Sequence, residues 1–119
     1  MLINFTNHPS KDWSQEQLEA AQKYGEIYDL PFPNIDPNAE PGDLIWKAAD
    51  CVSAICQLNP SAVLCQGEPT FNFIVVDLLK NLGLPVLAAC SKRETIEQHL
   101  GDKTIKTSIY KFVKFRSYF

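Results

Sequence analysis

Three short polar segments of this 119-residue chain carry the side chains that could do chemistry. They are residues 6–10, 66–72 and 90–94, and each follows a run of apolar residues typical of a buried strand. In open α/β sheets, the loops after the carboxyl ends of the strands bind phosphates and nucleotides. The three segments therefore predict a nucleotide-binding protein.

The first segment, Thr6–Ser10, offers an imidazole, an amide and hydroxyl groups. His8 is its only side chain with an unperturbed pKa near neutrality, so it could contact a ligand or protonate a leaving oxygen. The ligand-binding candidates around it are Asn4, Thr6, Asn7 and Ser10. The alternative is a turn in which Asn7 and Ser10 bond to their own backbone.

The second segment contains a glycine turn before an expected helix. Gly67 allows close backbone approach, and the helix start offers unpaired N–H groups to an anion. The candidates here are Gln66, Gly67, Glu68, Thr70 and Asn72. Glu68 is unusual at an anion site: it could complement the helix dipole, act as a base, or bind a 2′-hydroxyl or an adenine amino group. A single glycine is neither a dinucleotide fingerprint nor a Walker loop.

The third segment combines a serine with two cations. Ser91 and Glu94 have capping-box spacing, which predicts a short helix ending near Leu100. Lys92 and Arg93 would then stand in its first turn, where each cation costs about 0.3–1 kcal/mol. A bound phosphate would reverse that cost, with Ser91 as a further contact. The alternative is a loop with solvated cations.

The elements that must position these segments alternate along the chain. Apolar runs predict strands over 2–5, 26–30, 62–66, 85–90 and 105–119, and helical periodicity predicts helices over 14–24, 43–58, 69–82 and 92–100. This order predicts one α/β domain over residues 1–119: a Rossmann-like three-layer sandwich with a mainly parallel five-stranded sheet. The expected strand order is 2-1-3-4-5, with the fifth strand antiparallel at an edge.

The charge and amino-acid composition limit the classes of partner that the protein is expected to bind. The net charge is −3, although seven Lys/Arg face only three Asp/Glu from Lys92 onward. These residues do not predict a broad basic surface, so we do not expect the protein to bind duplex nucleic acid. We expect it to bind a compact anion near the C-terminal segment. The alternative is that these lysines protect an edge strand. No apolar run would span a bilayer, which makes the cytoplasm the expected compartment. Four cysteines without a C-x-x-C pair and two histidines predict no metal site and no cofactor.

Residues 4–9, 64–70 and 88–94 together resemble the small stand-alone proteins of type III CRISPR systems that consist of one CRISPR-associated Rossmann-fold domain. The resemblance implies a homodimer that binds a cyclic oligoadenylate second messenger, usually cyclic tetra-adenylate. It also implies that the turn 67–70 cradles the ring phosphates and that the loop 6–10 lies over the nucleotide. Glu68 departs from the neutral or basic turn of the wider fold, which puts the ligand contacts of this turn in question.

Members of that group either cleave the ring or sequester it, and both alternatives stay open here. Cleavage would need no metal, since a ribose 2′-hydroxyl attacks the adjacent phosphorus and leaves a 2′,3′-cyclic phosphate. His8 would protonate the leaving oxygen, and Lys92 and Arg93 would stabilise the phosphorane. A two-fold dimer would supply two copies of each residue to the ring. The other hypotheses are a small nucleotide- or phosphate-processing enzyme and a protein-interaction module without a ligand.

Overall fold

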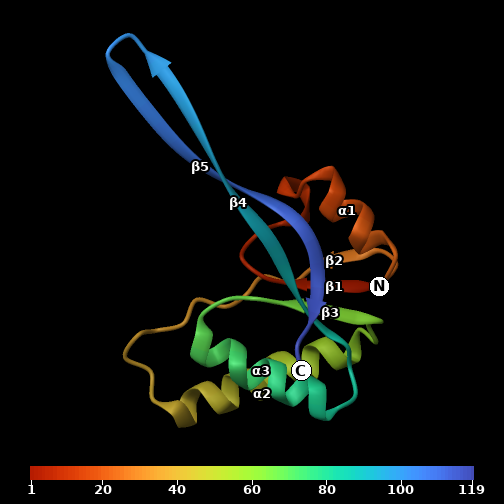
Figure 1. The fold of residues 1–119 in the computed structure, drawn as a ribbon. Helices are drawn as coiled ribbons and strands as arrows, with labels where there is room; N and C mark the ends of the chain where they lie inside the picture. Colours follow the sequence, from red (N-terminus) through yellow and green to blue (C-terminus); the bar gives the residue numbers. More distant parts are fainter.

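A computed structural model describes residues 1–119 as a sheet with helices on both faces (Figure 1). The elements in chain order are β1 (Leu2–Phe5), the 3-10 turn η1 (Ser10–Asp12), α1 (Gln15–Gln22), β2 (Ile27–Asp29), α2 (Pro41–Gln57), β3 (Ala62–Cys65), α3 (Pro69–Asn81), β4 (Val86–Leu100) and β5 (Lys103–Ser117). The strand order is β2-β1-β3-β4-β5, and only the β4–β5 pairing is antiparallel. The predicted fold class and strand order are confirmed.

The core lies on both faces of the two central strands. Every residue of β1 and β3 is buried, as expected for parallel strands covered on both sides. Because side chains alternate along a strand, Leu2 packs on the side of α1 with Ala21, whereas Ile3 packs on the side of α2 and α3. Figure 1 shows α1 on one face of the sheet and the other two helices on the opposite face.

Two helices begin at residues that are favoured at helix N-termini. The predicted cap of α1 is confirmed, since the backbone N–H of Gln17 donates to Ser14 Oγ over 3.2 Å. Helix α2 begins at Pro41, two residues before the predicted cap Asp43, because proline is favoured in the first turn of a helix. Its buried face carries Leu44, Ala48, Val52 and Ile55, whereas the neighbouring Ile45 is 53% exposed.

The predicted helix over residues 92–100 is wrong, because this segment is the second part of β4. Leu100 pairs with Lys103, which leaves Gly101 and Asp102 as a two-residue hairpin turn. The positive φ of 64° at Gly101 fits the first central position of a type II′ turn, a favoured hairpin connection. This turn, and the β-branched residues on both sides of it, outweigh the capping-box spacing.

The two long strands continue beyond the parallel sheet as a ribbon, here called the hairpin arm (residues 91–112) (Figure 1). A register shift between Cys90 and Ser91 leaves Val113 without a partner and marks the base of the arm. Such a bulge bends and twists a ribbon. The arm accounts for the radius of gyration of 17.0 Å, compared with about 13.5 Å for a compact domain of this length.

The end of β5 is tied back to the core by Tyr118. Its hydroxyl donates to the carbonyl of Cys65 over 2.8 Å and accepts from Nδ2 of Asn72 over 3.3 Å. The Cys65 thiol donates to Oδ1 of the same asparagine, and burial raises its pKa to about 12. Cys65 therefore stays a neutral thiol near neutral pH and holds β3, α3 and the C-terminal segment together.

Replacing Tyr118 by phenylalanine removes both hydroxyl hydrogen bonds and keeps the ring. We expect Tyr118→Phe to lower the free energy of unfolding by about 1–2 kcal/mol, measured by urea denaturation. The matched control is Tyr28→Phe, because the side chain of Tyr28 is 44% exposed. Equal stabilities of the two variants would contradict the anchoring role.

Candidate functional site

A cleft of about 830 Å³ opens where β1 and β3 end, between the loop after β1, the start of α1 and the base of the hairpin arm. This is the edge of the sheet at which the strand order predicts a ligand. Six of the residues predicted for the site line the cleft: Thr6, Asn7, His8, Gln66, Gly67 and Ser91. The other predicted residues lie outside its lining.

The loop after β1 is held by a buried hydrogen-bond network. Asn4 donates through Nδ2 to the carbonyl of His8 and to Oδ1 of Asp29, both over 2.8 Å. Its Oδ1 accepts from the hydroxyl of Thr6 over 2.8 Å, and that hydroxyl accepts from the backbone N–H of His8 over 3.1 Å. The polar atoms of Asn4 and Thr6 are thus used to shape the loop.

The far side of the loop is fixed by Asp29 and Trp13. Ser10 donates through its backbone N–H and its hydroxyl to the Asp29 carboxylate, over 3.2 and 2.9 Å. The indole N–H of Trp13 donates to the carbonyl of His8 over 3.0 Å. Both backbone polar groups of His8 are therefore bonded within the loop, and its exposed imidazole lines the cleft.

The N-terminus of α3 is already occupied by a carboxylate of the chain. Glu68 accepts from the backbone N–H of Phe71 over 2.8 Å and from the hydroxyl of Thr70 over 2.7 Å. These hydrogen bonds, that of Phe71 first, lower the pKa of Glu68. Glu68 and Thr70 do not line the cleft, and Asn72 lines a separate hollow beside Tyr118. Of the residues that the sequence grouped in this segment, the structure brings only Gln66 and Gly67 to the cleft.

Gly67 is needed for packing as well as for the cleft. A Cβ at this position would lie 2.3 Å from the ring of Phe32, far inside van der Waals contact. That ring in turn packs against Phe5 and Phe71, with centroid distances of 5.0 and 5.5 Å. The close approach predicted for Gly67 thus occurs with an aromatic side chain of the core.

Gln66 couples the cleft to the arm. Its side chain accepts from the backbone N–H of Ala89 over 2.9 Å and donates to the carbonyl of Ala89 over 3.4 Å. The amide thus takes the place of a strand residue just beyond the last β3–β4 pair, Leu64 and Leu87. This bond holds β4 beside the cleft at the point where the strand enters the arm.

The two predicted cations lie on the arm and not at a helix terminus. Because successive residues of a strand point to opposite faces, Lys92 and Arg93 project from opposite faces of the arm, and neither lines the cleft. Arg93 donates through Nη2 and Nε to the hydroxyl of Ser108 over 3.0 and 3.2 Å. The predicted convergence of these cations in one helical turn is wrong, because no helix forms there.

Several residues that line the cleft were missed by sequence reasoning, among them Trp13, Tyr110, Lys111 and Phe112. The last three are far from the three polar segments in sequence and reach the cleft only because β5 pairs with β4. The sequence predicted this strand and its place beside the fourth strand, but the helix predicted over 92–100 hid the extended pairing that brings these residues to the cleft. Trp13 also lies 6.5 Å from Phe115, centroid to centroid, so its ring contacts β5 as well as the loop after β1.

The chemistry of the cleft suits binding of a nucleotide. Its lining includes the imidazole of His8, the ammonium of Lys111, the carboxylate of Asp12 and the rings of Trp13, Tyr110 and Phe112. Aromatic rings stack on bases, and a cation attracts phosphate. No group of three or more His, Cys, Asp or Glu side chains is arranged to hold a metal ion.

Comparison with known proteins gives one match. Residues 1–116 match the model of a family described as "Uncharacterized protein MJ1673 family". The chain belongs to this family. The matched residues include β1 to β4, the cleft and all but the last residue of β5. No curated protein and no solved structure matches the chain. None of the helices combines the length and apolar character needed to cross a membrane.

A methyl group at position 67 would collide with Phe32. We expect Gly67→Ala to lower the free energy of unfolding by about 1–3 kcal/mol, measured by urea denaturation. The control is Gly42→Ala, because a Cβ there meets nothing within 4 Å. If Gly67→Ala were as stable as the control, the packing role of the glycine would be wrong.

The cap formed by Glu68 predicts a pH dependence. Because its pKa is lower in the folded state, its carboxylate contributes stability above the unfolded pKa of about 4.3, and this contribution is lost as the pH falls through the folded value. We expect Glu68→Gln to lower the melting temperature near neutral pH and to approach the wild type below about pH 4. A constant difference across this range would contradict the role of the ionised cap.

Proposed function

We propose that two copies of this protein bind one cyclic oligoadenylate, cyclic tetra-adenylate in the first place, and thereby limit type III CRISPR signalling. The observation that carries this proposal is the cleft at the ends of β1 and β3, which combines stacking surfaces with an imidazole and an ammonium group. The resemblance of residues 4–9, 64–70 and 88–94 to single-domain CRISPR-associated Rossmann-fold proteins supports the choice of ligand. The proposed function requires the protein to be in the cytoplasm, where this messenger is made.

The adenine bases are the part of the ligand that the cleft suits best. Trp13 is fixed by its indole N–H, and Tyr110 on the arm is 73% exposed, so its ring is available to a ligand. Stacking of a base on an aromatic side chain contributes about 1–3 kcal/mol. A ring of four bases thus gains affinity from several rings without a broad basic surface.

The phosphates would meet Lys111 and the loop after β1. Lys111 lines the cleft, whereas Lys92 and Arg93 of the same chain do not. Ser91 and the amide of Asn7 offer hydrogen bonds from opposite sides of the cleft. We therefore assign the main phosphate contact within one chain to Lys111.

The signal would be limited in one of two ways: by binding of the messenger alone, or by binding followed by cleavage. In the cleavage reaction, a ribose 2′-hydroxyl attacks the adjacent phosphorus and loses its proton to water, the bond to the 5′ oxygen breaks, and protonated His8 gives its proton to that oxygen. The immobile backbone of His8 would hold the imidazole in one place for this transfer. Nothing in this reaction needs a metal ion or a cofactor.

The direct test mixes the protein with radiolabelled cyclic tetra-adenylate in the presence of a chelator, followed by native and denaturing gels. A shifted complex with linear di-adenylate identifies a ring nuclease, and a shifted complex with an intact ring identifies a sequestering protein. The absence of a shift at micromolar protein would contradict the proposal and direct the search to mononucleotides.

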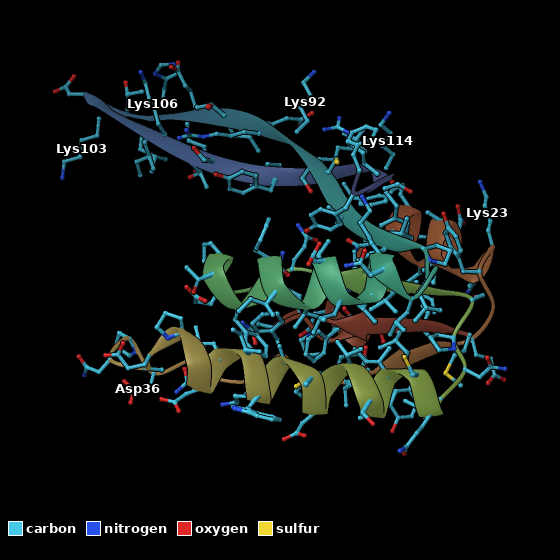
Figure 2. The ribbon with its side chains drawn as sticks, turned by 90° about the horizontal axis from the view of Figure 1, so that it is seen from below. Lys23, Asp36, Lys92, Lys103, Lys106 and Lys114 are labelled. Atoms are coloured by element: carbon cyan, nitrogen blue, oxygen red, sulfur yellow. The ribbon has the colours of Figure 1, made fainter.

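Variants of the cleft test its individual contacts. We expect Tyr110→Ala and Lys111→Ala each to weaken binding of the ring about tenfold, through loss of stacking and of one phosphate contact. The control is Lys23→Ala, because Lys23 caps the end of α1, away from the lining of the cleft (Figure 2). We expect His8→Ala to stop any cleavage while binding persists. Undiminished cleavage would remove His8 from the mechanism.

A further inference from the structure

The hairpin arm has two faces of different character. Residues that pair across an antiparallel ribbon point to the same face, and the register therefore assigns every side chain of the arm. Arg93 and Tyr110 share one face, and Glu94 and Ile109 share the other. These two faces are called the polar face and the apolar face below.

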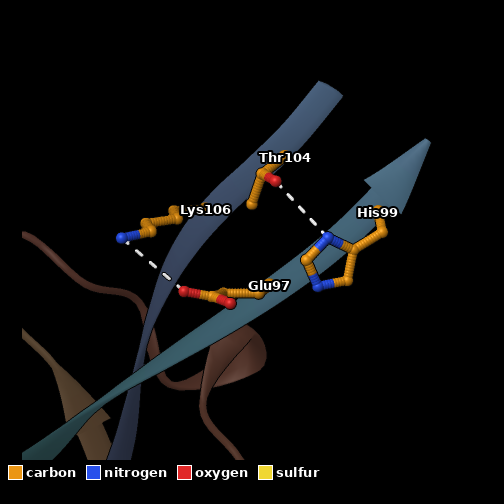
Figure 3. Close-up of polar contacts among 4 residues, drawn as sticks. All are labelled: Glu97, His99, Thr104 and Lys106. Atoms are coloured by element: carbon orange, nitrogen blue, oxygen red, sulfur yellow. Dashed lines mark hydrogen bonds and ion pairs between the residues drawn. The ribbon is translucent and has the colours of Figure 1, made fainter. Parts of the chain in front are cut away.

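The polar face is satisfied within the arm itself (Figure 3). Lys106 Nζ lies 3.6 Å from Glu97 Oε1, and the hydroxyl of Thr104 lies 3.3 Å from Nδ1 of His99. Closer to the base, the guanidinium of Arg93 is bonded across the ribbon as described above. The charged and hydroxyl side chains named here thus have partners within the arm, whereas Tyr110 at the base of the same face is 73% exposed and lines the cleft.

The apolar face has no such partner. It carries four large aliphatic side chains, which are 45%, 61%, 44% and 41% exposed: Ile96, Leu100, Ile105 and Ile109. A two-stranded ribbon alone is marginally stable in water, and a contiguous exposed apolar surface marks an interaction site. Burial of this face against a partner would therefore stabilise the arm.

The charges along the apolar face indicate what buries it. Lys92 and Lys111 pair at the base, Glu94 comes next, and Lys103 and Asp102 end the arm at its tip (Figure 2). A second arm packed in the same direction would place like charges together. A second arm packed in the opposite direction brings Lys103 to Glu94 and Asp102 of the turn to the two basal lysines.

We propose that the apolar face binds the apolar face of a second copy of this chain, with the two arms running in opposite directions about a two-fold axis. The same patch then meets itself, as a two-fold interface requires. Ile96 and Ile105 lie near the centre of the contact, where each arm covers the aliphatic side chains of the other. This proposal rests on the proposed function only in that the two copies would share one ring. The test of the arm contact needs no ligand.

This arrangement also brings a partner to the cleft. Each arm is about 33 Å long, because a strand rises about 3.3 Å per residue. The tip of one arm therefore reaches the base of the other, where Ile109 and Lys111 line the cleft.

The first test is the oligomeric state of the ligand-free full-length chain, measured by sedimentation equilibrium. The wild type is expected to be a dimer, and Ile96→Asp with Ile105→Asp is expected to be a monomer with an unchanged melting temperature at low concentration. The matched control is Thr95→Asp with Thr104→Asp, which adds the same charges to the polar face and is expected to remain a dimer. A monomeric wild type, or equal behaviour of both double variants, would overturn the proposal.

The second test is a charge exchange that reports direction. Glu94→Lys or Lys103→Glu alone creates like-charge contacts in both halves of the dimer and is expected to weaken association about tenfold. Combining both changes in one chain, or mixing the two single variants, restores opposite charges and is expected to restore the dimer. Failure of both to restore it would overturn the opposed direction of the arms.

The two proposals can fail separately. A dimer that depends on Ile96 and Ile105 but does not bind cyclic tetra-adenylate would support the arm contact and contradict the proposed function. Binding of the ring by a chain whose assembly is unaffected by both aspartate substitutions would overturn the arm contact and support the proposed function.

Discussion

The antiparallel pairing of β4 with β5 is the interaction on which the rest of this structure depends. It carries Tyr110, Lys111 and Phe112 from the C-terminal part of the chain to the ends of β1 and β3, where they meet the polar loops. Tyr118 fixes one end of this pairing to the core, and the side chain of Gln66 fixes β4 beside the cleft. Without this pairing the sheet would be entirely parallel with β4 at an exposed edge, and the cleft would lack the wall that β5 supplies.

Most polar side chains near the cleft are used to hold its walls. Asn4 and Ser10 shape the loop after β1 through Asp29, and Glu68 caps α3 in place of an external anion. This internal use of hydrogen bonds keeps the loops rigid, so a ligand meets preformed surfaces and loses less entropy on binding. The groups left for a ligand are the imidazole of His8, the Lys111 ammonium and the aromatic rings.

The sequence predicted the parts of the fold that local patterns determine. Apolar runs and helical periodicity were sufficient for the α/β class, and the alternation of elements was sufficient for the strand order, both of which the structure confirms. The prediction failed over 92–100, where a capping-box spacing competed with the turn signal of Gly101 and Asp102. The site was predicted in part, since loop residues follow their strands directly. Tyr110 and Lys111 were missed because their strand partners, Arg93 and Lys92, were assigned to a helix.

In the proposed account, the arm and the cleft place the binding site between two copies of the chain. One chain offers a single imidazole and a single lysine in its cleft, and a cyclic tetranucleotide presents equivalent phosphates on opposite sides. The most direct measurement of this account is isothermal titration calorimetry of the wild-type protein with cyclic tetra-adenylate under metal-free conditions. The account predicts saturable binding with one ring for every two chains. Binding of one ring per chain, or no binding at all, would contradict it.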